Sequence, residues 1–192
     1  MIYIFEGMDN CLKDTHIQLL RGQISAETQV LKFSNPPSSN KDPQSYQKRH
    51  FADMFSLLSL SLNNSSRNLI LNRAHLGEFV YSPIYRGYEA EWIFDLESEF
   101  LESINNKHSM IKLVLLYDSN NDQLLSREDG KSFSESDQNK LDDERKRFLE
   151  AFQRSHFKNK CKIDLSDYSK NIESIGSGRS IDTHKTLDVI LG

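Results

Sequence analysis

Short apolar runs alternate with longer amphipathic segments along the chain. Five short apolar-rich runs predict buried strands, at residues 2–5, 29–33, 68–71, 111–116 and 161–165. Apolar side chains recur at helical spacing in the segments between and after them, which predicts helices over residues 13–24, 44–62, 89–104, 134–154 and 181–190. Ser180 is a candidate N-cap for the last helix. This alternation predicts a three-layer α/β fold, with a five-stranded parallel sheet flanked by helices.

The length of 192 residues fits one domain, which we place over residues 1–192. The polar stretch 119–137 is long for a simple connection, so we expect it to form a mobile lid. Ligands of open parallel sheets bind at the carboxyl ends of the strands. The loops that follow the predicted strands are therefore the first places to look for chemistry.

Composition excludes several classes of protein. The 24 Lys and Arg against 28 Asp and Glu give a net charge of −4, which disfavours a strongly basic nucleic-acid binder. Two cysteines are too few for a disulfide framework or a four-cysteine zinc site, and the six histidines lack the H-E-x-x-H spacing of zinc hydrolases. The chain has no apolar run of the ~18 residues that a membrane helix needs, and its N-terminus lacks the basic region of a secretion signal. We therefore expect a cytoplasmic protein without a membrane partner.

The loop after the first predicted strand resembles a phosphate-binding loop. The phosphate-loop pattern is G-x-x-x-x-G-K-[ST], in which backbone N–H groups and the lysine hold phosphates. Gly7, Lys13 and Thr15 fit this chemistry, whereas Leu12 stands in place of the second glycine and Asp14 directly follows the lysine. Leucine adopts a positive φ poorly. The sequence thus leaves two alternatives: a loop remodelled around the phosphates, or weak or lost nucleotide binding.

The surrounding residues resemble the opening of the thymidylate kinases. That family usually runs F-E-G-x-D-x-x-G-K-[SD]-T, and this chain has Phe5-Glu6-Gly7-Met8-Asp9 followed by Lys13-Asp14-Thr15. Asn72-Arg73 stands where the family has Asp-Arg, and Tyr81 follows at the spacing of the family's substrate-pocket tyrosine. Segments 74–83 and 126–134 are similar to bacteriophage members of the family.

The resemblance implies a P-loop kinase that uses ATP and Mg²⁺. It implies a catalytic role for three cations, Lys13, Arg73 and Arg127. The nucleotide-binding residues that it implies are Gly7, Asp9, Asn10, Cys11, Leu12, Lys13, Asp14 and Thr15, with Thr15 or Asp14 reaching the metal. The acceptor-binding residues that it implies are Phe33, Asn72, Arg73, Tyr81 and Arg86. Because Asn72 carries no charge, we expect weaker support for the metal than an aspartate would give.

Each of these residues also has a structural interpretation. Asp9 fits an Asx-type turn as well as a contact with the acceptor sugar, and Phe33 and Tyr81 fit core packing. Arg127 and Lys131 fit a solvated loop. The thiol of Cys11 could be acidified near a helix N-terminus, or Cys11 is simply a small loop residue. His75 lies in the acceptor region but fits a structural role. Ser82 stands where many thymidylate kinases read thymine with glutamine. The loop Gly176-Ser177-Gly178 is either a linker or an adenine contact.

Three functions are compatible with these residues. The first is ATP-dependent phosphoryl transfer to a deoxynucleoside monophosphate, either dTMP or a modified pyrimidine analogue. The second keeps the donor and places the acceptor, hydroxymethyluracil, in bacteriophage DNA. The third is a catalytically impaired kinase that binds nucleotide or a protein partner. The resemblance also implies a homodimer formed through helices.

Overall fold

A parallel sheet lies at the centre of the molecule. The computed structural model describes residues 1–24, 26–33, 35–37, 39–63, 67–128, 130, 137–171 and 179–192. The sheet has five strands in the order β2-β3-β1-β4-β5, and every pairing is parallel. The strands are β1 (Ile2–Gly7), β2 (Thr28–Lys32), β3 (Asn68–Asn72), β4 (Ile111–Tyr117) and β5 (Lys160–Asp164). The predicted three-layer fold is confirmed.

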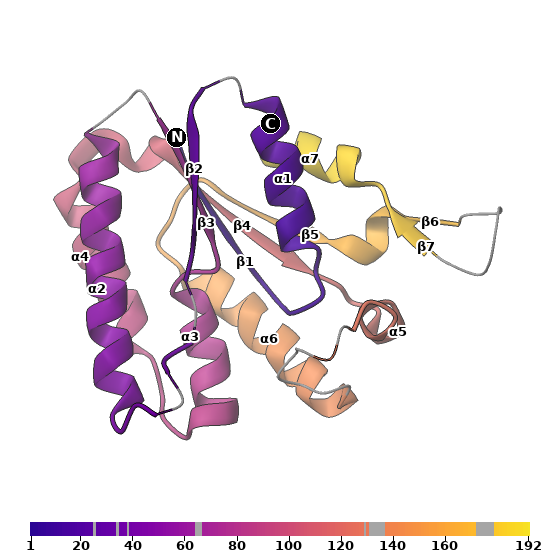
Figure 1. Cartoon of the computed structure of the whole chain (residues 1–192), viewed down its shortest axis with the longest axis horizontal. Helices are drawn as coiled ribbons and strands as arrows, with labels where there is room; N and C mark the ends of the chain where they lie inside the picture. The colour runs from indigo at the N-terminus through magenta and orange to yellow at the C-terminus, as the bar shows by residue number, and fades with distance from the viewer. Residues whose placement is uncertain are drawn as a thin grey trace.

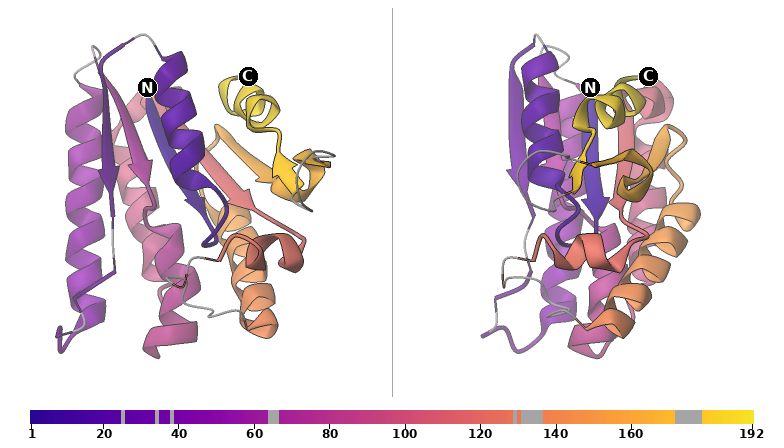
Figure 2. Two further views of the ribbon diagram at one scale, coloured as in Figure 1. Left: turned by 45° about the vertical axis from the view of Figure 1, so that its right-hand side comes forward. Right: turned by 90° about the vertical axis from the view of Figure 1, so that its right-hand side faces the viewer.

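Helices cover both faces of this sheet (Figures 1 and 2). The α1 and α7 helices pack together on one face, and α3 and α6 pack together on the other, while α2 packs against α4. None of the helices in the described ranges has the length and apolar content that crossing a bilayer requires. The bounds of these six helices are α1 (Lys13–Gln23), α2 (Pro43–Leu62), α3 (Leu76–Tyr81), α4 (Trp92–Ser103), α6 (Gln138–Arg154) and α7 (Thr183–Leu191).

The sequence pattern missed the short elements, because they contain too few residues to show a period. One of them, α5 (Asn121–Leu125), lies inside the stretch expected to form a lid. The predicted cap of the last helix was wrong: Asp182 caps α7, and its carboxylate accepts a hydrogen bond from the Lys185 N–H at 3.4 Å. The other missed elements in the described ranges are the helix α3, a π-helix η1 (Ser82–Arg86), 3₁₀ helices η2 (Asn105–Met110) and η3 (Leu165–Tyr168), and an antiparallel pair, β6 (Ser169–Asn171) with β7 (Arg179–Ile181).

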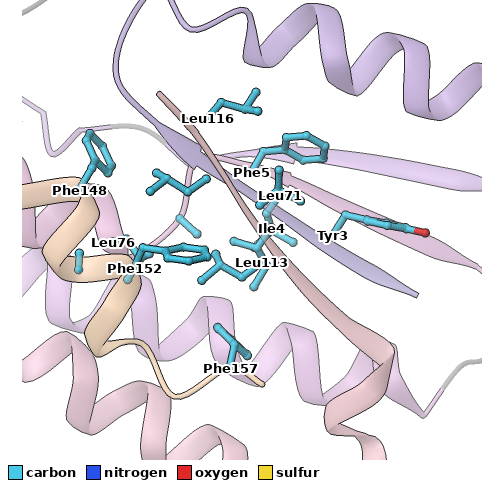
Figure 3. Packing of buried hydrophobic residues seen from close by; sticks show 14 of the residues in the cluster. Tyr3, Ile4, Phe5, Leu71, Leu76, Leu113, Leu116, Phe148, Phe152 and Phe157 are labelled. Atoms are coloured by element: carbon cyan, nitrogen blue, oxygen red, sulfur yellow. The ribbon is translucent and has the colours of Figure 1, made fainter. Parts of the chain in front are cut away.

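Both faces of the sheet are buried. Tyr3 and Phe5 point to one side, whereas Ile4 and Leu113 point to the other, where Phe152 of α6 lies (Figure 3). All six residues of β1 are buried. A strand covered on both faces needs apolar residues at successive positions instead of every second one. This requirement explains why the sequence shows short continuous apolar runs.

One carboxylate is buried within this apolar surrounding. Glu97 of α4 is fully buried, and its Oε2 lies 2.6 Å from Nε2 of His75. It also accepts hydrogen bonds from Ser155 Oγ, at 3.0 Å to each oxygen, and from the His156 backbone N–H. Glu97 therefore ties α4 to the segment after β3 and to the end of α6. The structural interpretation of His75 is confirmed.

We expect the substitution Glu97→Leu to destabilise the fold by roughly 3–5 kcal/mol, because it leaves buried polar partners unsatisfied. Urea unfolding would measure the loss. The matched control is Glu99→Leu on the same helix, where the side chain is exposed and the change should stay within about 0.5 kcal/mol. Equal midpoints for the two variants would contradict the role given to Glu97.

Candidate functional site

The loop after β1 begins with a glycine that no other residue can replace without a clash. Gly7 has φ of +142°, and a Cβ placed on it would lie 1.9 Å from the carbonyl oxygen of Leu116 in β4. Gly7 and Leu116 are partners in the register of the two strands. The close approach of two backbones thus fixes the direction in which the chain leaves the central strand.

The same loop ends in a strained leucine. Leu12 has φ 53° and ψ 29°, the left-handed conformation, and directly precedes α1. The left-handed region costs a leucine roughly 1–2 kcal/mol. The contacts around it hold this geometry: the Leu12 carbonyl accepts the His16 N–H at 3.0 Å and lies 2.8 Å from His16 Nδ1. The other ring nitrogen of His16 lies 2.6 Å from Thr186 Oγ1 in α7.

Lys13 is folded back into this loop. Its Nζ donates to the carbonyl oxygen of Gly7 at 2.8 Å and to that of Met8. Burial lowers the pKa of Lys13, and the nearby Arg73 guanidinium lowers it further. The acidified-thiol alternative for Cys11 was wrong, since burial raises the pKa of Cys11 to about 12. Lys13 therefore holds the loop together through two backbone carbonyls, and Cys11 is a buried residue with a weakly acidic thiol.

Asp14 and Asn72 meet where α1 begins and β3 ends. The Asn72 amide Nδ2 donates to Asp14 Oδ1 at 2.5 Å, while Asp14 and Thr15 are exposed. Carboxylate and hydroxyl oxygens are hard ligands of the kind that Mg²⁺ takes. No group of three His, Cys, Asp or Glu side chains within the described ranges could hold a metal by itself. This arrangement suits Mg²⁺, which usually combines one or two protein oxygens with water and phosphate oxygens.

Arg73 faces the loop from the end of β3. Its Nη2 donates to Oδ1 of Asp9, and its backbone N–H donates to the Phe5 carbonyl at 2.9 Å. Arg73 has φ of 68°, and Asn10 and Leu12 also have positive φ. Backbone strain of this kind concentrates at functional sites. Here the surrounding contacts hold three strained residues around one loop.

Arg127 approaches the loop from the segment after α5. Its Nη2 donates to Oδ2 of the fully buried Asp118, which follows β4. The Asn10 Nδ2 donates to Glu128 Oε2 at 2.9 Å, so this segment contacts the phosphate loop directly. The interpretation of Arg127 as a purely solvated residue was wrong. Lys131 lies outside the described residues, as does most of the second half of the predicted lid.

These groups surround an open cleft of about 440 Å³ at the carboxyl ends of the strands. Four cations line it, two of which, Arg73 and Arg127, are paired with carboxylates. The predicted nucleotide-binding residues thus lie together with the cations predicted to be catalytic, except Gly7, which lies where the loop leaves β1. The lining residues are Asp9, Asn10, Cys11, Leu12, Lys13, Asp14, Thr15, Lys32, Asn72, Arg73 and Arg127.

A second pocket adjoins the cleft and shares Arg73 with it. The predicted acceptor residues Phe33, Tyr81 and Arg86 line this pocket, whereas Asn72 lines only the cleft. Its volume is about 30 Å³, far below the roughly 300–1,000 Å³ of a typical small-molecule site. A ring-sized ligand can enter only if side chains move. The other lining residues are Glu6, Gly7, Asn35, Gln47, Phe51, Ala74, Gly77, Glu78 and Phe148.

Two buried polar residues at this pocket, Gln47 and Glu78, and a third in α6, Glu144, were not predicted from the sequence. Gln47 and Glu78 line it, and Glu144 of α6 accepts a hydrogen bond from the Tyr85 hydroxyl at 2.5 Å. Burial raises the pKa of Glu144 to about 7, with Asp9 adding to the effect. A usable signal was present, because Gln47 and Glu144 fall on the apolar stripes of the helices that carry them. A polar residue on an apolar stripe marks a buried polar contact.

Two further predictions concern the edges of the site. Ser82 is fully buried, and its hydroxyl donates to the Glu78 carbonyl at 2.7 Å, which accounts for its position without a ligand. The loop Gly176-Ser177-Gly178 lies outside the described residues, so its adenine contact stays a prediction.

Comparisons with solved structures find similar architectures in other proteins, two of which are named as kinases. The chain is similar in structure to the YorR protein from Bacillus subtilis in complex with phosphorylated GDP, with a TM-score of 0.64, 16% identity, and coverage of 100% of this chain and 94% of that one. It is also similar to thymidylate kinase from Candida albicans, with a TM-score of 0.57, 15% identity, and coverage of 99% and 90%. For deoxyadenosine kinase from M. mycoides with bound dATP, the TM-score is 0.53, the identity 15%, and the coverage 100% and 97%.

Comparison by amino-acid sequence gives no match of this kind. No protein-family model matches the chain, and no curated protein matches it in sequence. At identities this low, the structural likeness establishes the fold alone. The chain has the three-layer P-loop kinase fold that the alternation of strands and helices, together with the resemblance to the thymidylate kinases, led us to expect.

We expect Gly7→Ala to destabilise the protein by roughly 2–4 kcal/mol, because the added methyl group overlaps a backbone oxygen that cannot move aside. Gly22→Ala is the matched control: a Cβ there meets nothing within 4 Å, and alanine stabilises a helix interior by about 0.5–1 kcal/mol relative to glycine. Urea midpoints should therefore shift in opposite directions. A Gly7→Ala midpoint at the wild-type value would refute the close approach.

We expect Glu144 to make the fold less stable as the pH rises from about 4.5 to about 7, the interval between its ordinary and folded pKa values. In this interval the unfolded chain ionises first, so ionisation favours unfolding. Glu144→Gln should therefore match the wild type at pH 4.5 and exceed its stability at pH 8 by roughly 2–3 kcal/mol. Urea unfolding at the two pH values measures the difference. Glu150→Gln, at an exposed position of the same helix, should show no such gain.

Proposed function

We propose that this chain transfers the γ-phosphoryl group of ATP to the phosphate of a deoxynucleoside monophosphate, dTMP or a modified pyrimidine analogue. One observation carries the proposal: Lys13, Arg73 and Arg127 come from three separate segments and line one cleft, next to a pocket with aromatic walls. Phosphoryl transfer depends mainly on positioning and on neutralising charge. The names of the similar kinases, and the phosphorylated GDP and dATP bound to two of the similar proteins, support the same reaction class.

The reaction needs no general base from the protein. An oxygen of the acceptor phosphate forms a bond to the γ-phosphorus, and the bond from that phosphorus to the bridging oxygen breaks and leaves ADP. Lys13 would exchange its two loop carbonyls for β- and γ-phosphate oxygens. Arg73 would hold the acceptor phosphate as a bidentate donor, and Arg127 would neutralise charge on the transferred group.

Asp14 and Thr15 would hold the magnesium ion. Their exposed oxygens on the cleft fit its preference for hard ligands, and the ion supplies further neutralisation of phosphate charge when it is bound. The Asn72 amide fixes one Asp14 oxygen through its 2.5 Å hydrogen bond. This contact leaves the second oxygen of Asp14 for the metal or its water shell.

The acceptor base would lie among Phe33, Tyr81 and Arg86, at the wall of the smaller pocket. Hydroxymethyluracil in duplex DNA is the alternative acceptor, and a homodimer in the cytoplasm is the proposed state of the protein. We also propose that the segment over residues 119–137 acts as the lid, because its described part already carries Arg127 to the cleft.

The deciding experiment is incubation with γ-labelled ATP and Mg²⁺, with the four deoxynucleoside monophosphates, hydroxymethyl-dUMP and hydroxymethyluracil DNA as acceptors. We expect label on a pyrimidine monophosphate, and we expect Lys13→Met to lower the rate by roughly 100- to 1,000-fold through loss of charge stabilisation. Lys158→Met, at an exposed position, is the control and should keep the wild-type rate.

The outcomes separate the alternatives. Label on DNA alone would move the acceptor onto a polymer. Absence of label everywhere, in the wild type and in a Leu12→Gly and Asn72→Asp double variant, would overturn the enzymatic proposal. The chain would then be a kinase in fold only.

A further inference from the structure

The side-chain amide of Gln47 has a buried oxygen that accepts no hydrogen bond from the described residues. Gln47 lies near the start of α2, is 2% exposed and lines the smaller pocket. Its Oε1 is buried and has no hydrogen-bond partner among the described residues. A buried acceptor without a partner costs roughly 1–3 kcal/mol. Such an atom at a pocket wall indicates a ligand that donates a hydrogen bond to it.

Glu78 determines which end of this amide faces the pocket. The Gln47 Nε2 donates to Glu78 Oε2 at 3.1 Å. Turning the amide over would set its oxygen against a carboxylate, which can only accept when ionised. Glu78 is itself held in place by Arg86 Nη1 at 2.5 Å and by the Tyr88 hydroxyl. The acceptor at the pocket wall is therefore a fixed property of the site.

The rest of the pocket suits a flat heteroaromatic ring. Phe33, Phe51, Tyr81 and Phe148 supply aromatic surface, and aromatic rings stack on the faces of nucleobases. Arg86 brings guanidinium donors to the same wall, close to Gln47 because both bind Glu78 Oε2. An acceptor beside a donor is the complement of a base edge, which offers an N–H next to a carbonyl or ring nitrogen.

We propose that Gln47 selects the acceptor base, by accepting a hydrogen bond from an N–H on its pairing edge. Glu78 is the positioning residue that holds the amide in the accepting orientation. The inference rests on the proposed function, since it places the base of the acceptor nucleotide in this pocket. It goes beyond that proposal by assigning specificity to a residue of α2.

Gln47→Met keeps the volume of the side chain and removes the acceptor. The control is Gln153→Met in α6, the same substitution at an exposed position that lies outside both pockets. Calorimetry would measure the binding of dTMP, dCMP, dAMP and dGMP to each variant. We expect Gln47→Met to lower the affinity for the preferred nucleotide roughly 10- to 100-fold. The differences in affinity among the four nucleotides should become smaller. Gln153→Met should leave all four affinities unchanged.

A second measurement, made on the wild type, does not depend on how a variant folds. Methylating the pairing-edge N–H of the preferred nucleotide removes the donor, so its affinity should fall by a similar factor. In Gln47→Met, the methylated and unmethylated forms should bind alike. Intact folding of both variants is checked by their melting temperatures.

The possible failures are distinguishable. If the wild type phosphorylates a nucleotide but Gln47→Met weakens all four nucleotides equally, or the methylated form binds as well as its parent, the assignment of Gln47 falls and the proposed function stands. If none of the four nucleotides binds to the wild type and none is phosphorylated, both fall. If the wild type prefers one base and Gln47→Met loses that preference, but no nucleotide is phosphorylated, the proposed catalysis is refuted. The role of Gln47 in selecting the base is then kept.

Discussion

The site depends on the contact between two backbones at the end of the central strand. Because β1 lies between β3 and β4, the chain that leaves it has neighbours on both sides. The absence of a side chain at Gly7 lets it turn against the Leu116 carbonyl. From that point the loop must reverse direction within a few residues and begin α1 at Lys13. The strained conformations of Asn10 and Leu12 follow from this short path, and so does the position of Lys13.

Much of the fold was predictable because burial on both faces of a sheet leaves a plain record in sequence. The strands 68–72 and 111–117 contain the apolar runs 69–71 and 113–116, and the pattern located both strands within a residue. The short helices α3 and α5 were not predictable, since their stability comes from tertiary contacts rather than from a period of their own. The same holds for the π-helix, whose backbone pattern has no simple sequence signature.

The residues of the candidate site likewise fall into two groups, those that a local sequence motif identifies and those that only tertiary packing brings together. The loop after β1 and Arg73 each lie in a short contiguous motif, so a linear pattern could identify them. Gln47 of α2 and Glu78 of α3 come from different helices, and only packing brings them to one pocket. The polar character of Gln47 and Glu144 on apolar stripes indicated burial but not which residues they would contact. The hydrogen bond between Asn72 and Asp14 likewise joins residues 58 positions apart. The sequence of neither segment predicts this contact.

The hydrogen bond between His16 and Thr186 spans 170 positions of the chain. His16 supports the strained carbonyl of Leu12 on one side and the last helix on the other. During synthesis, a domain can finish only the contacts whose partners have already emerged. The loop after β1 is synthesised long before α7, which carries the brace behind it. The loop therefore gains this support only after α7 has been made and has packed against α1.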